Sequence, residues 1–528
     1  MYLNGERAMS TTPNISRPED EKLRIGPTFA YGLQHVLTMY GGIIAVPLII
    51  GTAAKLTPAE IGLLIASCLF IGGLATILQS WGVPFFGSKL PLVQGVSFSG
   101  VATMTAILDA GEGLQGVFGA VIAASIAGLI VAPFFAMIVR FFPPVVTGTV
   151  ITTIGLTLMP VAARWAMGGT SEEDPMWGSM QNIGLAMGTL LIVLVLSKFG
   201  TPTISRLAIL ISIVAGTAFA GVMGWADFSN IADGGFVAFP QPFAFGWPTF
   251  GVASIISMFI VMIVTMTETT ADIIAVGEIV GTKVDSKRIA NGLRADMISS
   301  AVAPVFNSFT QSAFAQNVGL VAITGVKSRF VVTAGGVILV VLGLLPVVGG
   351  LVAAVPPPVL GGAGIVLFGS VAAAGIRTLS KVKYEGNMNM VIVAVSLGFG
   401  VIPVVLPDFY NAFPTWVGII LHSGISSAAI MAVLLNLLFN HLGGKSGERS
   451  AFVAGSGRII REDDLARLLA DKTLYNGDTI KDGKVVDADG EEVPVVTASQ
   501  EVVITDAIKT GKIRSREDVR RVLEESDS

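Results

Sequence analysis

Two acidic residues, Glu268 and Asp272, lie one helical turn apart in an otherwise apolar stretch of the sequence. Residues four positions apart share one face of a helix, so both carboxylates point to the same side. An ionisable group buried in a membrane is costly, and it is a functional hypothesis by default. A carboxylate at this place can accept two N–H donors of a heterocycle, and away from water it can also carry a proton. The alternative for either acid is a role in helix packing.

A third acid and a histidine extend this set of candidates. Asp296 lies in the next apolar stretch as a candidate proton carrier, with partial neutralisation by nearby Arg294 as the structural alternative. His35 lies in the first apolar stretch. A histidine titrates near neutral pH, but among apolar neighbours it also serves as a hydrogen-bonding bridge between helices. We expect Asp272, Asp296 and His35 to have supporting or proton-coupling roles.

Two short segments, residues 91–100 and 311–320, interrupt the apolar pattern. Both contain glycine, and both are polar at the centre. Transporters often place their substrate at discontinuous helices in matching positions of two repeats. Irregular backbone at membrane depth survives only where it faces protein or a wet cavity. The alternative is that both segments are marginal helices with small residues on their packing faces.

Particular side chains of these segments suit a flat polar ligand. Gln316 and Asn317 each offer a donor and an acceptor, which matches the alternating C=O and N–H groups of an oxopurine. Phe98 can stack on a planar ring or belong to the core, and we expect its neighbours Ser97 and Ser99 to expose polar backbone groups. We expect Glu268 and Gln316 to lie close enough together to hold one base between them.

The elements that must position these residues are membrane helices. Of the 528 residues, 52% are hydrophobic and only 13% are charged, whereas soluble domains carry about 25% charged residues. A spanning helix needs about 20 mostly apolar residues. We therefore predict an all-α polytopic membrane protein with fourteen spans, of which the third, ninth and tenth are short: 28–51, 59–80, 91–107, 116–140, 144–163, 181–197, 205–225, 252–276, 290–304, 313–325, 329–350, 355–376, 388–406 and 413–440.

The charges of the predicted loops orient these spans. With the N-terminus in the cytoplasm, thirteen Lys and Arg residues fall on inside loops and only Lys55 and Arg164 fall outside, as the positive-inside rule requires. The two interrupted segments lie seven spans apart. Because seven is odd, the two halves of the chain run in opposite directions and form an inverted repeat. We expect a multi-pass protein of the cell inner membrane with both termini in the cytoplasm.

The chain divides into three parts by composition. Residues 1–23 are a short polar arm, residues 24–442 are the transmembrane transporter domain, and the charged residues 443–528 are a cytoplasmic tail that we interpret as a small accessory region. The single cysteine, Cys68, excludes a disulfide or a cysteine-based metal site within the monomer. Neither a cofactor nor nucleic acid is expected. No nucleophile or metal-ligand motif indicates an enzyme.

Four segments resemble the nucleobase–ascorbate transporter family, also called the nucleobase cation symporter 2 family. They are Gly32-Leu-Gln-His35, Lys89-Leu-Pro-Leu-Val-Gln-Gly-Val-Ser-Phe98, Glu268-Thr-Thr-Ala-Asp-Ile-Ile-Ala-Val-Gly-Glu278 and Gln316-Asn-Val-Gly-Leu-Val-Ala-Ile-Thr324. The last matches the family's Gln-Asn-x-Gly-x-x-x-x-Thr signature. The resemblance covers roughly residues 24–440. One departure is Gly325, which stands where many relatives have a basic residue.

The resemblance implies a fold and a site. Spans 1–4 and 8–11 would form a core domain, spans 5–7 and 12–14 a gate domain, and spans 3 and 10 would contain short antiparallel strands. Homodimers through the gate domain are common in the family. By motif match, Glu268 and Gln316 would hold the base, with Ala315 and Phe98 giving backbone or ring contacts. Asn317, Asp272, Asp296 and His35 would support binding and proton coupling.

The resemblance also narrows the cargo. Uracil members of the family tend to carry Glu where Gln316 stands and His where Asp272 stands, and ascorbate members usually have Pro in place of that Gln. The sequence therefore predicts an elevator-type symporter that moves a purine such as xanthine or urate together with a proton. A uracil permease of the same family is the nearest alternative. An anion exchanger of the same architecture is a more distant one, and it should tolerate neutralisation of Glu268.

Overall fold

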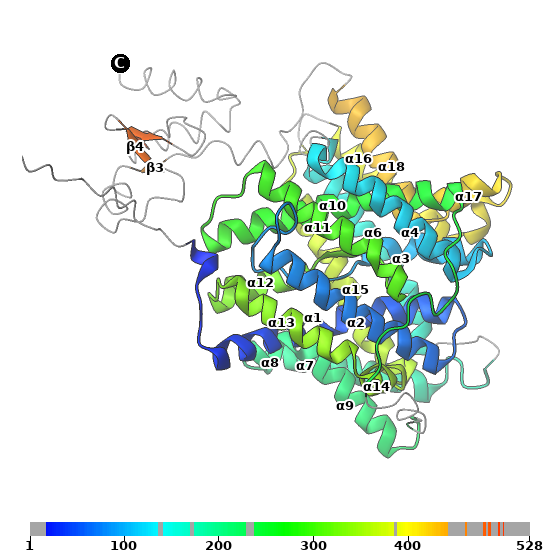
Figure 1. Ribbon diagram of the computed structural model, residues 1–528. Coiled ribbons are helices and arrows are strands. Elements are labelled where there is room, and N and C mark those ends of the chain that lie inside the picture. Colours follow the sequence, from blue (N-terminus) through cyan, green and yellow to red (C-terminus); the bar gives the residue numbers. More distant parts are fainter. Residues whose placement is uncertain are drawn as a thin grey trace, which may run out of the picture.

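The computed structural model describes residues 17–135, 141–168, 174–226, 228, 237–384 and 388–441, together with short parts of the tail at 460–461, 479–481, 484–486, 495–496 and 500. The first half contains α1 (Ile25–Ala53), α2 (Pro58–Trp81), β1 (Gln94–Val96), η2 (Phe98–Gly100), α3 (Val101–Asp109), α4 (Gly113–Val131), α6 (Pro144–Met167), α7 (Met180–Phe199), α8 (Pro202–Arg206) and α9 (Ala208–Val222). The helices run side by side in Figure 1, and residues 17–24 lie at one end of the bundle.

The second half repeats this order of long helices, a strand and short helices. It contains α10 (Val252–Val280), α11 (Ser286–Val302), β2 (Gln311–Ala313), α12 (Ala315–Thr324), α13 (Arg329–Gly343), α14 (Pro346–Ala353), α15 (Pro357–Leu379), α16 (Asn389–Val405), α17 (Thr415–Leu421) and α18 (Gly424–Asn436). The described tail residues include four strands of two or three residues, β3 to β6. The rest of the predicted tail lies outside the described residues.

Each of the fourteen predicted spans coincides with a helical segment, and the third and tenth each consist of a strand followed by a short helix. Among the described residues, eight helices are long and apolar enough to cross a membrane, and α13 with α14 forms a ninth that bends by 79°. Shorter apolar helices supply further segments. The molecule is thus an all-α polytopic membrane protein, as predicted.

Two predicted spans are continuous in the prediction and broken in the structure. The segment predicted over 413–440 is divided into α17 and α18, because Ser423 caps the N-terminus of α18 by accepting a hydrogen bond from the Ser426 amide at 3.2 Å. The segment predicted over 329–350 bends before α14, where Pro346 is the first residue. Proline lacks an N–H and favours the start of a helix. Hydropathy alone does not register either break.

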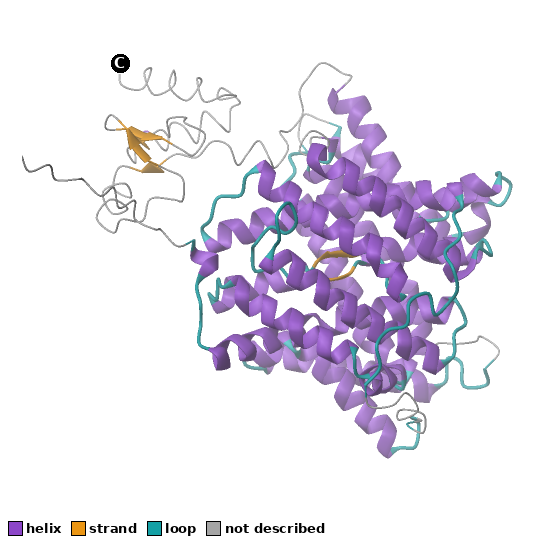
Figure 2. Ribbon diagram, in the orientation of Figure 1, coloured by secondary structure: helices purple, strands orange, loops and turns teal. Residues whose placement is uncertain are grey.

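The strands β1 and β2 form a two-stranded antiparallel ribbon in the middle of the helical bundle (Figure 2). Gln94 lies opposite Ala313, and Val96 lies opposite Gln311. The third and tenth segments therefore run in opposite directions, as an inverted repeat of two seven-segment halves requires. The ribbon satisfies backbone groups that would otherwise be unpaired at membrane depth.

The helices pack in two sets. In one set, α13 packs against α1 and α2, and α4 packs against α10 and α11. In the other set, α15 packs against α6 and α7, while α16 packs against α18. The α2–α13 contact is very close at Gly73, where an added Cβ would lie 2.6 Å from the carbonyl oxygen of Gly336. Small residues permit such close approach between membrane helices.

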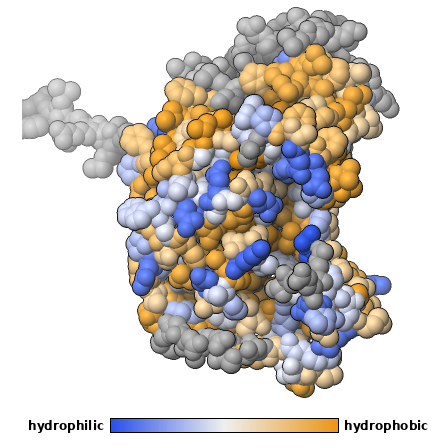
Figure 3. Space-filling model, turned by 90° about the vertical axis from the view of Figure 1, so that its right-hand side faces the viewer, coloured by the Kyte–Doolittle hydropathy of each residue, from blue (hydrophilic) through white to orange (hydrophobic). Residues whose placement is uncertain are grey.

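The perimeter of the bundle is apolar. On α7, Met187, Leu191 and Leu194 are each more than half exposed, which suits contact with lipid rather than water. Figure 3 looks at the end opposite residues 17–24, where hydrophilic residues gather across the middle and hydrophobic residues predominate toward the edges. At this end, an apolar perimeter thus surrounds the hydrophilic middle (Figure 3).

Residues 17–24 form a strap across their end of the bundle. Glu19 is fully buried and accepts a hydrogen bond from Arg288 of α11 at 2.5 Å. The same guanidinium donates to the carbonyl oxygens of Ser88 and Lys89. Asp20 pairs with Arg329 at 2.6 Å, and Arg329 also donates to the carbonyl of Trp81. The strap thereby joins the ends of α2, α11 and α13.

Candidate functional site

The β1–β2 ribbon brings the two interrupted segments together at the centre of the molecule. Two backbone hydrogen bonds extend the ribbon beyond the strands, from the Phe314 amide to the Val93 carbonyl at 3.0 Å and from the Ser97 amide to the Thr310 carbonyl at 2.8 Å. The helices η2 and α12 begin directly after their strands. The first amides of a helix have no intrahelical partner and carry a partial positive charge. Both helix starts therefore gather backbone donors beside the ribbon, of which the Ser99 amide donates to the Ser97 hydroxyl and the Asn317 amide to the Phe314 carbonyl.

The ring of Phe314 fixes the start of α12 against the other segments. Phe314 is buried. Its ring lies between Gly42 of α1 and Gly95 of β1, and an added Cβ at either glycine would lie 2.6 Å from a ring carbon. Only glycine leaves room for the ring at both positions. The placement of Ala315 and Gln316 therefore depends on both glycines.

Glu268 lies on α10, which packs against η2, β2 and α12. Its Oε2 accepts a hydrogen bond from the Ser99 hydroxyl at 2.7 Å. The side chain is partly exposed rather than sealed in the core, so the second carboxylate oxygen remains open to a ligand. One turn later, Asp272 is also partly exposed, and it has no hydrogen bond or ion pair with the other described residues.

Asp296 is linked to the ribbon through one intermediate residue. Its Oδ2 accepts a hydrogen bond from the Thr269 hydroxyl at 2.6 Å, and Thr269 Oγ1 in turn accepts the Ala313 amide of β2 at 3.3 Å. Asp296 Oδ1 is buried without a hydrogen-bond partner among the described residues. The neutralisation by Arg294 that the sequence left open is not found, because Arg294 donates to Asn291 at 2.8 Å. Asp296 is therefore connected to the ribbon through Thr269, the residue that follows Glu268.

His35 and Asn317 join α1 to α12. The Asn317 side-chain amide donates to the His35 carbonyl at 3.0 Å and lies 3.1 Å from His35 Nδ1. Both side chains are buried. Of the two interpretations of His35, the geometry matches the bridge between helices. Asn317 Oδ1 has no partner among the described residues.

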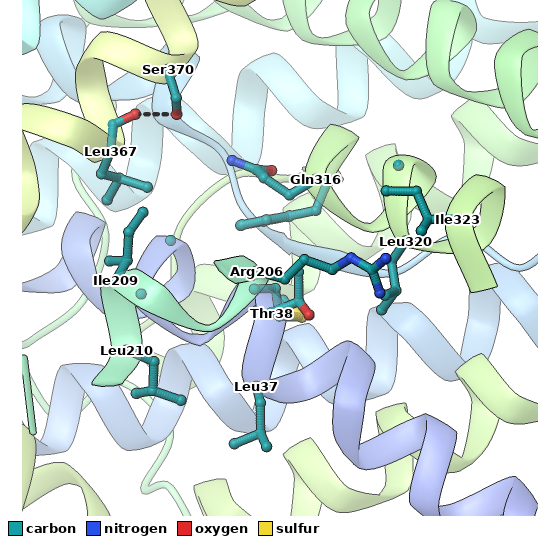
Figure 4. Close-up of a pocket in the computed structure, with 15 residues that line it drawn as sticks. Leu37, Thr38, Arg206, Ile209, Leu210, Gln316, Leu320, Ile323, Leu367 and Ser370 are labelled. Atoms are coloured by element: carbon teal, nitrogen blue, oxygen red, sulfur yellow. Dashed lines mark hydrogen bonds between the residues drawn. The ribbon is translucent and has the colours of Figure 1, made fainter. Parts of the chain in front are cut away.

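Gln316 and Ala315 are exposed, and Gln316 lines a cavity of 230 Å³ between α1, α8, α9, α12 and α15 (Figure 4). Glu268 is not among the residues that line this cavity. Gln316 and Glu268 thus lie on helices that pack against each other, α12 and α10, but no hydrogen bond joins them within the described part of the chain. The pair is not closed over a ligand in this structure.

Phe98 and Ser97 lie at the far end of the ribbon. Ser97 is buried, and its hydroxyl accepts the Ser99 amide at 3.2 Å. The Phe98 ring is partly buried and packs edge-on against Phe368 of α15, with ring centroids 5.9 Å apart. Phe368 in turn lies 6.1 Å from Trp165 of α6. Phe98 therefore lies where the first set of helices meets the second.

Buried hydroxyl groups form a second contact between the two sets of helices. Thr103 of α3 lies 2.7 Å from Ser423 and 3.3 Å from Ser426, measured between side-chain oxygens. Ser257 of α10 also lies 3.3 Å from Ser426. All four residues are fully buried. We call these four residues the hydroxyl seam.

Three side-chain contacts around the candidate site were not predicted. Ser99 holds Glu268, Thr269 holds Asp296, and Phe368 faces Phe98. Ser99 and Thr269 lie within the segments that the sequence analysis identified. Their positions in the sequence are therefore a signal that could have placed them near the acids. Phe368 lies in an ordinary apolar stretch, and no local signal marks it.

Discontinuous membrane segments that meet in a central ribbon, with carboxylates and amides around it, define a polytopic membrane permease. Comparison with known families agrees with this class. The model Xan_ur_permease, described as Permease family, matches residues 26–409. The chain belongs to the nucleobase–ascorbate transporter family.

Relatives of known name lie in the same family. The chain is 41% identical over 430 residues to the uric acid transporter UacT of Escherichia coli, covering 80% of this chain and 89% of that protein. It is 40% identical over 415 residues to the xanthine permease of Bacillus subtilis, covering 79% of this chain and 94% of that protein. These proteins belong to the branch that the sequence predicted.

Two solved structures with a similar fold are distant from this chain in sequence. The transmembrane domain of a cyanobacterial bicarbonate transporter, BicA, aligns with a TM-score of 0.51 at 16% identity, covering 79% of this chain and 99% of that chain. The murine anion transporter Slc26a9 in an inward-facing state aligns with a TM-score of 0.54 at 14% identity, covering 95% and 88%. At these identities the likeness concerns the fold alone.

Proposed function

We propose that this protein imports an oxidised purine base, such as xanthine or urate, together with a proton. The observation that carries the proposal is the central ribbon, which sets the start of α12 and its Gln316 against α10 and its Glu268. The relatives named uric acid transporter and xanthine permease support the same cargo. A uracil permease is the second candidate.

In this proposal the base lies between the two half-helices. The Glu268 carboxylate accepts two ring N–H groups, and the Gln316 amide pairs with the neighbouring C=O and N–H groups. The backbone at Ala315 and the ring of Phe98 contact the faces and edge of the base. Asn317 and His35 support binding by fixing α12 against α1. Closure of Glu268 and Gln316 over the base completes the site.

The driving proton is carried by Asp296 or by Glu268 itself. Asp296 is linked to the ribbon by two hydrogen bonds through Thr269. The charge of Asp296 therefore changes the hydrogen bond that Thr269 accepts from the Ala313 amide. Asp272 lies on the same face of α10 as Glu268 and supports the charge balance of the site. Substrate and proton are coupled because both act on the same strand and helix.

Transport then follows from a movement of one set of helices against the other. The core is formed by the segments from α1 to α4 and from α10 to α14, and the gate by those from α6 to α9 and from α15 to α18. The separate packing of these sets supports this division. The core carries the site between the two faces in an elevator-type movement. Both termini lie in the cytoplasm, the inner membrane is the location, and the gate forms a homodimer.

Uptake of labelled xanthine and urate into proteoliposomes with an imposed proton gradient tests the proposal. Glu268→Gln and Gln316→Ala should each lower uptake at least tenfold, because each removes hydrogen bonds to a buried polar ligand worth about 1.5–3 kcal/mol. Glu278→Gln is the matched control, since Glu278 is an exposed acid on the same helix. Wild-type uptake by both variants would show that the site is elsewhere.

Competition by unlabelled bases separates the candidates. Xanthine and urate should reduce uptake, whereas uracil should not. Uptake without a proton gradient at the same rate would contradict symport. An anion exchanger of this architecture would retain its activity in the Glu268→Gln variant.

A further inference from the structure

The cavity next to Gln316 lies between the two sets of helices. On one side it is lined by α1 and by α12, including Thr38 and Gln316. On the other side it is lined by α8, α9 and α15, including Arg206 and Ser370. Among the described residues that line it, Arg206 is the only charged one. Within the described part of the chain, a molecule in this cavity therefore meets one cation and no carboxylate.

The polar groups of the cavity differ in their availability. Thr38 donates its hydroxyl to the Gln34 carbonyl at 2.8 Å, and Ser370 donates to the Leu367 carbonyl at 2.6 Å. These hydroxyls are engaged by their own helices. Arg206 and Gln316, in contrast, have no hydrogen bond or ion pair with other residues in the described ranges. The cavity thus offers one free guanidinium and one free amide.

The Arg206 side chain extends across the cavity. It comes from the last residue of α8 and points toward Leu320 of α12, and Gln316 lines the same cavity (Figure 4). A cation near the C-terminal end of a helix or at the membrane edge is common without any ligand. That ordinary role predicts no effect that depends on the charge of a substrate.

We propose that Arg206 is a specificity residue that selects the anionic form of an oxidised purine in this cavity. The inference rests on the proposed function and adds the charge of the preferred substrate. Urate is an anion at neutral pH, and its oxygen and deprotonated nitrogen present two adjacent acceptors. A guanidinium fork matches two such acceptors, whereas a lysine ammonium acts as a point charge. Gln316 then contacts the neutral edge of the same ring.

The proposed movement restricts this contact to one conformation of the protein. Arg206 belongs to the gate and Gln316 to the core, so the two face the same cavity only while the helices are arranged as here. The attraction therefore acts on the substrate in this conformation and not after the core has moved. Ile323, near the C-terminal end of α12, also lines the cavity. Arg206 thus selects charge where the base passes between the gate and the core.

Binding measurements at mildly acidic pH test the inference, because there xanthine is neutral while urate remains an anion. Titration calorimetry on purified protein should show that Arg206→Gln raises the Kd for urate roughly tenfold and leaves the Kd for xanthine nearly unchanged. Arg206→Lys should lie between wild type and Arg206→Gln. Lys198→Gln is the matched control, since Lys198 is an exposed cation at the end of α7 and does not line the cavity.

The affinities of the variants for urate and xanthine decide whether Arg206 selects charge. An equal loss of affinity for urate and xanthine, or no loss for either, would overturn the selection of charge by Arg206. A urate-specific loss in the Lys198→Gln control would show a general surface effect and would overturn it as well. Failure of the wild-type protein to bind either purine would instead contradict the proposed function itself.

Discussion

The Thr269 hydroxyl donates to the Asp296 carboxylate at 2.6 Å and accepts the Ala313 amide at 3.3 Å. Thr269 therefore stands between an acid of α11 and the strand that leads into α12. Thr269 also directly follows Glu268 in the sequence. A change in the charge of Asp296 therefore acts, through Thr269, on both sides of the proposed base: on the helix that carries Glu268 and on the strand that leads into α12. A threonine hydroxyl suits this position because it donates and accepts at once.

Thr269→Val should uncouple Asp296 from the ribbon. Valine keeps the shape of threonine but leaves Asp296 Oδ2 and the Ala313 amide without their partner, which costs about 1–3 kcal/mol. We expect uptake to fall at least tenfold and its dependence on the proton gradient to weaken. Uptake in proteoliposomes at several gradients measures both effects.

Thr269→Ser is the matched control for this prediction. Serine retains the hydroxyl, so uptake should return close to the wild-type rate. Full proton-driven uptake by Thr269→Val would show that Asp296 acts by another route.

Thr103→Val should loosen the hydroxyl seam between α3 and α18. The change removes hydrogen bonds to Ser423 and Ser426, at a net cost of about 1 kcal/mol, or roughly fivefold in an equilibrium. Hydrogen–deuterium exchange should therefore become faster in α17 and α18. Thr105→Val is the control, because Thr105 donates only to carbonyls of its own helix. Equal exchange in both variants would contradict a role of the seam in holding the two sets of helices together.

Arg288→Ala should destabilise the strap formed by residues 17–24. It leaves Glu19, whose side chain is 1% exposed, without its cation, and breaking one partner of a buried ion pair costs about 3 kcal/mol or more. We expect a clear fall in the Tm of the detergent-solubilised protein. Lys287→Ala, at the exposed neighbouring position, should leave the Tm almost unchanged.

A second variant separates the ion pair from general damage to α11. Adding Glu19→Gln to Arg288→Ala removes the stranded charge, so the double variant should be more stable than Arg288→Ala alone. If the loss of stability in the double variant equalled the sum of the losses in Glu19→Gln alone and Arg288→Ala alone, Glu19 and Arg288 would not be coupled.

The sequence predicted the membrane spans well because hydropathy and the charges of loops act through the bilayer, which is the same for every span. It predicted the interruptions of the third and tenth segments, but not the breaks in two other spans. The division between α17 and α18 depends on the capping of a single helix by Ser423, and the bend before α14 depends on Pro346. Such local hydrogen bonds and missing donors leave the average hydropathy of a segment unchanged.

The candidate site was predicted unevenly for a similar reason. Glu268, Asp296 and Gln316 are conspicuous because a polar group in an apolar segment is costly. The role of Thr269 was not predicted, since threonine is common in membrane helices and its importance comes from a partner on another helix. In the sequence, Arg206 is only one of the thirteen Lys and Arg residues of the predicted inside loops, because nothing in the sequence places α8 beside α12.

The ribbon of β1 and β2 also has a bearing on how the protein is made. Its two strands are far apart in the chain, since Val96 pairs with Gln311. A nascent chain that has not yet delivered Ala313 to the membrane leaves Gln94, Gly95 and Val96 without their partner strand. Assembly of the ribbon must therefore wait for insertion of the second half, and until then, of these three residues, only the Gln94 backbone, which bonds the Thr76 hydroxyl of α2, has a partner from the described residues of the first half.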